Sequence, residues 1–338
     1  MAATLHDVAR VAEVSIKTVS NVINDYPHIR PATKQRVLDA IAELGYSPNI
    51  TARNLRSGRT GVIGLAVPEL SLSYFAELAD AVIKAADSRG VTVLIEQTAG
   101  DRDREIQLLT SPRRQLTDGL LFSALGMGAD DAEYLRVKYP LVLLGERIFG
   151  GPTDHVTMQN VDAARAATAH LIASGRRRIA VVGAHEGEVI GSAGLRLRGY
   201  REALAEAGIP FDPQLISYTG LWHRANGAAC MRALLDSGVQ FDGVFALNDT
   251  LALGAMRVLQ EAGIRVPVDV GVIGFDDLDE AQYSIPTLST IDPGREQIAA
   301  TAVTVLLDRI AHGPGSTPPR EIEADFRVVE RESSAAAS

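Results

Sequence analysis

The sequence predicts an all-α head with a helix-turn-helix, followed by a hinge helix and an α/β body of two lobes. Residues 4–46 carry three short amphipathic helical patterns, whereas from Gly61 onward short apolar runs alternate with helical stretches. Apolar runs of strand length that alternate with helices of about 10 to 15 residues are typical of parallel sheets covered on both faces. Because residues 61–338 exceed one comfortable doubly wound sheet, we expect two such sheets, one in each lobe.

A helix-turn-helix is predicted at the start of the chain. Thr4 followed by Asp7 favours a capping box at the start of the first helix. Ser15 offers an N-cap to a second helix over Ile16–Asn24. Only about three residues separate the two helices, which is the turn length that leaves a second helix free to enter a major groove.

The outward face of the second helix carries Ile16, Lys17, Ser20 and Asn21. An asparagine amide can bind adenine through two hydrogen bonds, a lysine can reach guanine or phosphate, and an isoleucine can contact the methyl group of thymine. The same pattern fits a solvated helix pair in some larger domain, because short amphipathic helix pairs are common. The residues that follow favour the DNA-binding interpretation.

A third helix completes the head. Pro31 is placed to open this helix and Gly45 to close it, so we assign residues 1–47 to the head. We expect residues 48–60 to form a hinge helix and linker, in which Ile50–Arg56 gives only one or two helical turns. So short a helix is marginal in water, and we expect it to form against a partner or DNA.

Charge and composition limit the class of protein. The net charge is −9, but residues 1–60 hold eight Lys or Arg against five Asp or Glu, a net +3 that leaves −12 for the remainder. A cationic head on an anionic body confines phosphate attraction to one end of the molecule. No apolar run of about 18 residues and no signal-peptide core is present, so we expect a cytoplasmic protein without a membrane span. The single cysteine, Cys230, excludes an internal disulfide and a cysteine-cluster metal site.

The body is predicted from alternating strands and helices. The expected strands are Val62–Val67, Val91–Ile95, Gly119–Phe122, Leu141–Leu144, Ile179–Gly183, Gly243–Leu247 and Val270–Phe275. The expected helices are Tyr74–Ser88, Asp103–Gln115, Val161–Ser174, Leu197–Ala207, Ala225–Ser237, Asp249–Ala262 and Arg295–His312. Ligands of such sheets bind beyond the carboxyl ends of the strands, and two lobes can share one cleft there.

Polar and aromatic side chains follow several of these strands. They are Pro68–Phe75, Gly145–Arg147, the loop near Arg196, Trp222–His223, Asn248–Asp249 and Asp276–Asp277. Amide, carboxylate and guanidinium groups beside an aromatic ring suit a polyhydroxylated ligand, whose hydroxyls need hydrogen-bond partners and whose C–H faces stack on rings. A sugar or a nucleoside therefore fits this edge better than a lipid.

At this point the chain resembles the lactose-repressor (LacI/GalR) family of bacterial transcription regulators, from Thr4 to about Glu330. Seven blocks in the same order carry the resemblance: TLHDVARVAEVSIKTVSNVIN, AIAELGYSPNITARNLRSGRTGVIGLAVP, DGLLF at 118–122, HLIASGRRRIAVVG at 170–183, RLRGYREAL at 196–204, FALNDTLALGAM at 245–256 and VGVIGFDD at 270–277. The resemblance implies a homodimer that reads two half-sites of palindromic double-stranded operator DNA.

The resemblance also implies which residues bind DNA. They are Thr4, Ser15, Ile16, Lys17, Thr18, Ser20, Asn21, Asn24, Tyr46, Asn49, Ala52, Arg53 and Leu55. In the hinge helix, Ala52 would face its two-fold mate and Leu55 would be the wedge inserted into the minor groove. Such a wedge costs a few kcal/mol of base unstacking, which a bent site that contacts more protein offsets.

For the body, the resemblance implies a two-lobed, periplasmic-binding-protein-like fold with a small effector, most simply a sugar, in the cleft. The effector residues would be Tyr74, Phe75, Glu146, Arg147, Arg196, Trp222, Asn248 and Asp276. A structural ion pair remains the alternative for Arg196 and Asp276, and core packing for Trp222. The implied boundaries are 61–160 plus 291–318 for the first lobe, 161–290 plus 319–331 for the second, and a disordered tail at 332–338.

The chain departs from the family pattern at several positions. Glu13 occupies a turn position where glycine is usual, and because a left-handed conformation costs Glu about 1 kcal/mol we expect an adjusted turn. Arg30 stands where the third helix usually has a hydroxyl cap. Glu146 is longer than the aspartate frequent there, and Arg147 adds a cation. The tail ESSAAAS lacks a leucine heptad, so we expect a dimer without the tetramer-forming coiled coil of some members.

Other functions find little support in the sequence. The seven histidines show no metal-ligand spacing, and no G-x-S-x-G, P-loop or G-x-G-x-x-G motif is present, so we expect neither an enzyme nor a cofactor. A solute-binding protein would need a signal peptide, and it would not need the helical region of residues 1–60. Within the regulator interpretation, a sugar that releases DNA and a corepressor metabolite, such as a nucleobase or a sugar phosphate, both remain open. We favour the first.

Overall fold

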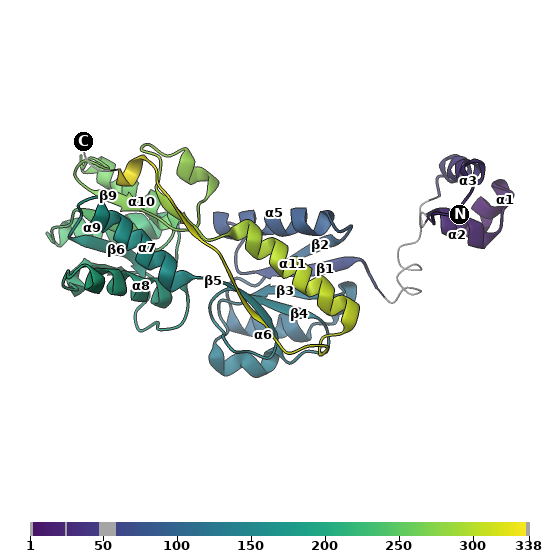
Figure 1. Cartoon of the computed structure of the whole chain (residues 1–338), viewed down its shortest axis with the longest axis horizontal. Helices are drawn as coiled ribbons and strands as arrows, with labels where there is room; N and C mark the ends of the chain where they lie inside the picture. Colours follow the sequence, from purple (N-terminus) through teal and green to yellow (C-terminus); the bar gives the residue numbers. More distant parts are fainter. Residues whose placement is uncertain (1–2, 24–25, 47–58, 336–338) are drawn as a thin grey trace. The chain divides into compact units, whose positions relative to one another are not determined.

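The computed structural model describes residues 3–23, 26–46 and 59–335 (Figure 1). The chain forms two compact units, residues 1–60 and residues 61–338. We call the first unit the head and the second the body.

In its described residues the head has three packed helices, α1 Leu5–Val11, α2 Ile16–Ile23 and α3 Pro31–Leu44. The predicted capping box is confirmed, because Oγ1 of Thr4 accepts from the amide of Asp7 and the Asp7 carboxylate accepts from the amide of Thr4 over 3.0 Å. The core of the head contains Val8, Ala9, Ala12, Val19, Val22, Val37, Ala40 and Tyr46.

The turn between α1 and α2 keeps a left-handed residue. Glu13 has a φ of 53°, so our expectation of an adjusted turn is wrong. The amide of Val14 donates to the carbonyl of Ala9 over 3.0 Å, and this bond closes the turn around the strained residue. The amide of Thr18 donates to Oγ of Ser15 over 3.1 Å, so Ser15 caps α2 as predicted. Arg30 gives α3 no side-chain cap.

The first lobe of the body contains a six-stranded parallel sheet with strand order β11-β5-β4-β3-β1-β2. The strands are β1 Val62–Val67, β2 Thr92–Gln97, β3 Leu120–Ser123, β4 Leu141–Leu144, β5 Asp154–Met158 and β11 Glu321–Ala324. The helices are α5 Ser73–Asp87, α6 Arg102–Thr110 and α11 Arg295–His312. Leu65 and Val67 pack toward α5 and α11, whereas Ala66 packs toward α6. Both faces of the sheet are therefore buried, as the apolar runs predict.

The second lobe contains a four-stranded parallel sheet with strand order β7-β6-β8-β9. The strands are β6 Ile179–Ala184, β7 Ile216–Tyr218, β8 Gly243–Ala246 and β9 Gly271–Ile273. Helices α7 Asn160–Ala173 and α8 Ser192–Glu206 share one core, and α9 Arg224–Asp236 and α10 Asp249–Glu261 share the other.

Short 3-10 helices occur in both lobes, at Pro112–Leu116, Ala129–Leu135, Pro213–Leu215, Asp279–Gln282 and Glu332–Ser334.

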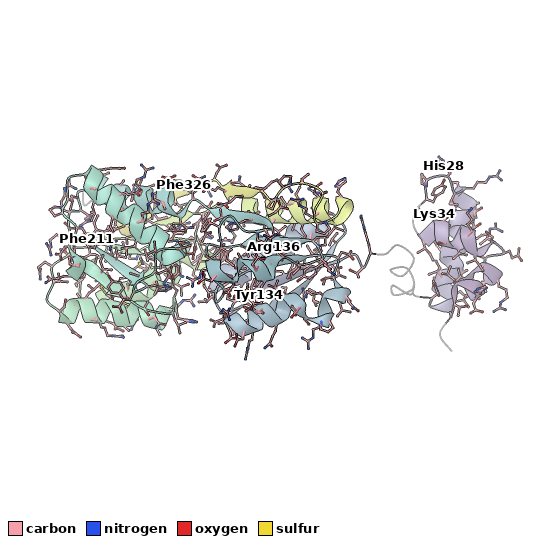
Figure 2. All side chains as sticks on the ribbon, turned by 90° about the horizontal axis from the view of Figure 1, so that it is seen from below. His28, Lys34, Tyr134, Arg136, Phe211 and Phe326 are labelled. Carbon is pink, nitrogen blue, oxygen red and sulfur yellow. The ribbon has the colours of Figure 1, made fainter. Side chains whose placement is uncertain are left out.

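The chain passes between the lobes at three places. It enters the second lobe after β5, returns to the first lobe between β10 Thr290–Asp292 and α11, and leaves again after β11. Strand β12 Arg327–Val329 pairs antiparallel with β10. Between β11 and β12, Phe326 packs against the core of the second lobe (Figure 2).

Two of the implied boundaries need correction. The resemblance implies that residues 319–331 belong to the second lobe, but β11 pairs with β5 and therefore belongs to the first sheet. In Figure 1 this last segment (yellow) runs beside β5 before it crosses. We also expected a disordered tail from residue 332, but Ser333 and Ser334 are buried. Oγ of Ser333 donates to the carbonyl of Val272 over 2.7 Å, and Oγ of Ser334 donates to Oγ of Ser289 over 2.7 Å. These hydroxyls satisfy buried polar groups, which holds the segment in place.

Candidate functional site

A cavity of about 440 Å³ lies between the two lobes of the body. Its walls include the residues that follow the carboxyl ends of β1, β4, β6 and β8, which is where ligands of parallel sheets bind. All eight predicted effector residues line this one cavity: Tyr74, Phe75, Glu146, Arg147, Arg196, Trp222, Asn248 and Asp276. The fold thus brings together residues that are about two hundred positions apart in the chain.

Arg196 is buried and fixed on several sides. Its Nε donates to Oδ1 of Asn160 over 2.8 Å, and its Nη1 donates to the carbonyl of Leu247. The guanidinium carbon lies 3.5 Å from the ring centroid of Phe275, a distance at which a cation is attracted to the face of the ring. The guanidinium therefore has a single orientation, with Nη2 3.7 Å from Oδ1 of Asp276.

Asp276 is buried beside Arg196, but the pair does not saturate the carboxylate. Within the described part of the chain, no hydrogen bond reaches either carboxylate oxygen of Asp276. Burial raises the pKa of Asp276 to about 7, against the opposing charges of Arg196 and Arg295. In its ionised form the carboxylate is free to accept hydrogen bonds from the hydroxyl groups of a ligand in the cavity. The ion pair with Arg196 is thus one contact of Asp276, and the carboxylate oxygens stay available to a ligand.

Asn248 and Trp222 are also held in place by the protein. Oδ1 of Asn248 caps α10 by accepting from the amide of Leu251 over 2.8 Å, so Nδ2 is the donor that this side chain can offer to a ligand. Nε1 of Trp222 donates to the carbonyl of Gly183 over 2.8 Å. The indole packs against both cores of the second lobe and lines the cavity. Trp222 therefore combines the packing role with a ring at the cavity wall.

Tyr74 and Phe75 form an aromatic wall at the start of α5. Their rings meet edge to face with centroids 5.2 Å apart, and both pack against the core of the first lobe. Burial raises the pKa of Tyr74, so its hydroxyl stays protonated and can donate a hydrogen bond.

Glu146 and Arg147 line the cavity but are engaged by the protein. Oε2 of Glu146 accepts from Oγ1 of Thr157, and Oε1 accepts from the amide of Met158 over 3.1 Å. Burial raises the pKa of Glu146, although both hydrogen bonds favour the ionised form. Nη1 of Arg147 donates to Oε2 of Glu188 over 2.9 Å. Since Glu188 belongs to the second lobe, this ion pair joins the lobes at the cavity wall.

The predicted effector set leaves out several polar residues of the cavity, among them Glu69, His185, Glu188 and His223. Glu69 and His223 belong to segments predicted to follow strand ends, whereas His185 and Glu188 do not. Nδ1 of His185 lies 2.8 Å from Oε2 of Glu188, whose Oε1 accepts from two amides at the start of α8. Burial alone would raise the pKa of Glu188, but the hydrogen bonds from His185 and Gly194 and the charge of Arg147 lower it. The rule that finds Asn248, position after a strand end, would also have found His185 after β6.

The predicted DNA-reading residues of α2 lie at the surface of the head. Ile16 and Lys17 are exposed, and Ser20 and Asn21 are half-buried. Ser15, Thr18 and Thr4 take part in the helix caps, whereas Tyr46 is only 8% exposed and packs in the head core. Asn24, Asn49, Ala52, Arg53 and Leu55 lie outside the described residues. His28 and Lys34, labelled in Figure 2, are further exposed residues of the head.

The described residues hold no cluster of three or more His, Cys, Asp or Glu side chains that could bind a metal ion. In the same part of the chain, no helix has the length and apolar content needed to cross a bilayer.

Two family models match the chain. Residues 4–49 match the model of bacterial regulatory proteins, lacI family, and residues 168–334 match the model of a periplasmic binding protein-like domain. The chain is 35% identical to the HTH-type transcriptional regulator CelR of Thermobifida fusca over 338 residues. The matched region covers 98% of each protein.

Solved structures of similar proteins agree with this match. A putative transcriptional regulator of the LacI family from Sanguibacter keddieii is 52% identical, with a TM-score of 0.77, over 82% of this chain and 99% of that chain. A complex of the transcriptional regulator CelR with cellobiose is 33% identical, with a TM-score of 0.72, over 98% and 99%. The Lac repressor dimer bound to operator and an anti-inducer is 28% identical, with a TM-score of 0.82, over 99% and 100%.

Proposed function

The chain belongs to the lacI family of bacterial regulatory proteins, and on this premise we propose that it represses sugar-metabolism genes. It binds a palindromic operator as a homodimer, and a small sugar in the cavity between the lobes releases it. Since its target is bacterial DNA, it acts in the cytoplasm. The function is one of binding and needs neither a catalytic step nor a cofactor.

The observation that carries the sugar assignment is the set of polar groups around Trp222. Arg196, Asn248 and Asp276 bring a guanidinium, an amide donor and a carboxylate to the same cavity. This set can hold the hydroxyls of a sugar while the indole covers an apolar face of its ring. The complex of the similar regulator CelR with cellobiose supports the same class of ligand.

The charges of the cavity favour a neutral sugar over a sugar phosphate. The two arginines of the wall already face carboxylates, Arg147 at Glu188 and Arg196 at Asp276. A phosphate group would have to compete with these carboxylates for the same cations, whereas hydroxyls can bind between them. A corepressor of the sugar-phosphate type is therefore the second candidate, and a nucleobase remains compatible with the aromatic walls.

The head supplies the DNA-binding part of the proposal. Ile16, Lys17 and Asn21 lie on α2, the helix that a helix-turn-helix places in the major groove. The operator complex of the Lac repressor dimer, which the whole chain matches, supports this use of the head. In the hinge, Ala52 would then face its two-fold mate and Leu55 would enter the minor groove between the two half-sites.

Ligand and operator are linked through the lobes. A ligand shifts the equilibrium only by its different affinity for the two states of the protein, and the linkage is reciprocal. In an induced repressor, the sugar binds more tightly to the state that has lost the operator. In a corepressed regulator, the metabolite binds more tightly to the operator-bound state.

A fluorescence experiment tests the proposal. Trp222 is the sole tryptophan of the chain, so its emission reports binding in the cavity directly. We expect a neutral mono- or disaccharide to change this emission and to weaken operator binding. A sugar that changes the emission and tightens operator binding would favour the corepressor alternative. A chain that responds to no sugar, but to a nucleobase or a sugar phosphate, would refute the sugar assignment.

A further inference from the structure

Two consecutive residues at the cavity have left-handed backbones. The φ angles of Asp276 and Asp277 are 115° and 49°, conformations that residues with a Cβ atom rarely adopt. Strained backbones of this kind persist where surrounding contacts fix them. Because Asp276 lines the cavity, the contacts of this loop decide where its carboxylate points.

Arg295 holds the backbone of the loop from the first lobe. It is the first residue of α11, a helix of the first lobe, and its side chain is 18% exposed. Nη1 donates to the carbonyl of Asp276 over 2.7 Å, and Nη2 donates to the carbonyl of Asp277 over 3.5 Å. A planar guanidinium can bind two successive carbonyls at once, which the single ammonium group of a lysine does poorly.

Glu77 on α5 completes this grip. Its Oε2 lies 2.6 Å from Nη2 of Arg295, and its Oε1 accepts from the amide of Asp279 over 3.1 Å. Ser73, one turn earlier on α5, donates to Oε1 of Glu280 over 2.8 Å. One face of α5 therefore holds the second half of the loop, and the Glu77 carboxylate orients the guanidinium that holds the first half.

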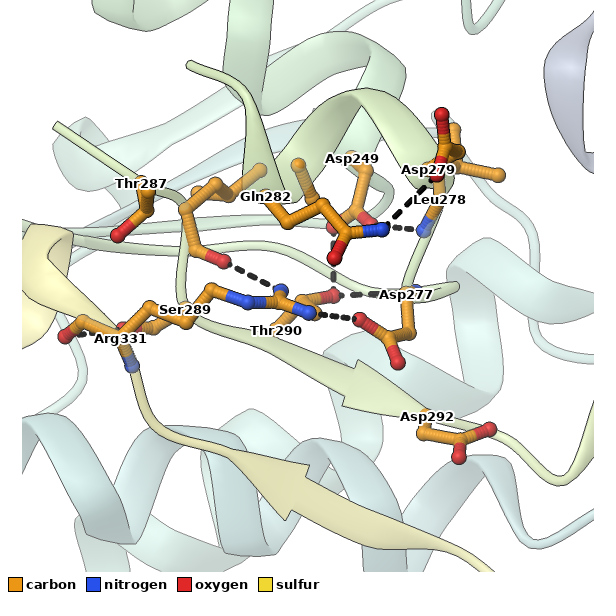
Figure 3. A network of polar contacts seen from close by, with 12 residues as sticks. Asp249, Asp277, Leu278, Asp279, Gln282, Thr287, Ser289, Thr290, Asp292 and Arg331 are labelled. Carbon is orange, nitrogen blue, oxygen red and sulfur yellow. Dashed lines mark hydrogen bonds and ion pairs between the residues drawn. The ribbon is translucent and has the colours of Figure 1, made fainter. Parts of the chain in front are cut away.

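The loop is also anchored within its own lobe (Figure 3). Nη2 of Arg331 donates to Oδ1 of Asp277 over 2.6 Å. Asp249, the neighbour of Asn248, accepts from the amide of Leu278 over 2.9 Å and from Oγ1 of Thr290 over 2.6 Å. These contacts attach the loop to the second lobe, whereas Arg295 and Glu77 attach it to the first.

We propose that Glu77 and Arg295 are positioning residues for the ligand contact made by Asp276. This inference rests on the proposed function, since it assigns Asp276 to the sugar. The pair fixes the left-handed loop from the opposite lobe, so the carboxylate is aimed at the ligand when the lobes are closed. A substitution of Glu77 or Arg295 leaves Asp276 itself unchanged, but the backbone of the loop can then leave its left-handed conformation. The sugar thereby loses a hydrogen-bond acceptor of fixed position.

The first test titrates the full chain with glucose and with cellobiose and follows Trp222 fluorescence. For a sugar that binds the wild type, Glu77→Gln and Arg295→Lys each weaken binding about tenfold, because each removes a charge-assisted contact of the loop. Arg198→Lys is the matched control, since Arg198 pairs with Glu202 at 2.7 Å on the exposed side of α8; it binds like the wild type. Wild-type affinity in both loop variants would overturn the inference.

A double-mutant cycle separates positioning from general destabilisation. In an Asp276→Asn background, Glu77→Gln causes no further loss of sugar affinity, because the carboxylate that it positions is absent. The same tenfold loss in both backgrounds would show that Glu77 acts independently of Asp276 and would overturn the inference.

Hydrogen exchange of the backbone amides, measured without sugar, gives a further test that does not depend on the ligand. The amides of Leu278 and Asp279 exchange faster in Glu77→Gln than in the wild type, whereas Arg198→Lys leaves them unchanged. Unchanged exchange in Glu77→Gln would overturn the inference even if sugars bind. If the wild type binds no sugar but Glu77→Gln still exchanges faster than the wild type, the sugar assignment is refuted. Glu77 is then kept as the residue that holds the loop.

Discussion

Nη1 of Arg147 donates to Oε2 of Glu188 over 2.9 Å and thereby joins the first lobe to the second at the wall of the cavity. Glu188 is held in turn by His185 and by two amides of α8. The acceptor of this bridge is therefore held by the second lobe, and Arg147 supplies the contact from the first lobe. The ion pair is half-buried and stabilises this arrangement of the lobes more than an exposed pair would.

Arg147→Met is expected to weaken sugar binding about tenfold, because the closed lobes lose a charge-assisted hydrogen bond. Titration of Trp222 fluorescence measures this loss. Arg136→Met is the control, since Arg136 pairs with Glu133 at the surface of the first lobe (Figure 2). Equal affinity in the two variants would show that the bridge does not contribute to closure around the ligand.

The pKa of Asp276 predicts how sugar affinity depends on pH. Burial raises this pKa to about 7, and a proton on the carboxylate competes with the hydroxyls of the ligand. Affinity is therefore constant well above pH 7 and falls by up to about tenfold per pH unit below it. Titrations between about pH 5.5 and 8.5 measure the profile, and Asp276→Asn removes this component. A wild-type profile without a change near pH 7 would contradict the assignment.

The same shift affects stability in the opposite direction. The pKa of Asp276 is higher in the folded chain than the ordinary value of 3.8. The contribution of this group to stability is then complete below the unfolded value and is lost as the pH rises through about 7. Urea unfolding without ligand is expected to show a smaller decrease in stability between about pH 4 and 7 for Asp276→Asn than for the wild type, because the decrease occurs between the unfolded and the folded pKa.

Arg196→Met is expected to destabilise the body by about 3 to 5 kcal/mol and to abolish sugar binding, because it leaves Asp276 buried without its cation. Urea unfolding of the full chain, followed by Trp222 fluorescence, measures the first effect. Arg198→Met, two residues later on the same helix and exposed, serves as the control. A loss of binding without any loss of stability would show that Arg196 acts through ligand contacts alone.

The ordered tail gives a prediction of its own. Ser333→Ala removes the hydroxyl that donates to the carbonyl of Val272 and accepts from the amide of Ser289. Two buried groups lose their partner, which costs about 1 to 3 kcal/mol. Thermal unfolding of the full chain measures this cost. Ser88→Ala, at the exposed end of α5, is the comparison, and an equal effect of both changes would contradict the buried role of Ser333.

Continuous apolar runs and long helices are predicted well from the sequence. β4 and α11 have the predicted bounds, because each is specified by its own pattern of apolar residues. Strands β5, β7, β10, β11 and β12 are not predicted. β7, β10 and β12 have three residues each, which carry no recognisable period, and the sequences of β5 and β11 contain too many polar residues to form an apolar run. Neighbouring strands decide their conformation. A disordered tail is predicted because serines and alanines are typical of a solvated segment, whereas partners distant in the sequence bury Ser333 and Ser334.

The site is predicted as a set of residues more reliably than as a set of roles. Residues after strand ends meet at one edge of a sheet, so Asn248 and Asp276 could be placed in a shared cleft. The engagement of Glu146 by Thr157 and of Arg147 by Glu188 depends on contacts between separate elements. No local pattern specifies such contacts. The buried position of Tyr46 likewise follows from the packing of the head.

The proposed function requires that the chain recognise a specific operator and release it when a sugar binds. The full chain can select bound duplexes from a random-sequence library, with and without the sugar that changes Trp222 fluorescence. We expect one palindrome to be enriched, to be bound at nanomolar concentration, and to be released when the sugar is added. We also expect Asn21→Ala to change the preferred sequence. Failure to enrich any sequence, or an enriched palindrome whose affinity the sugar leaves unchanged, would contradict the proposed function.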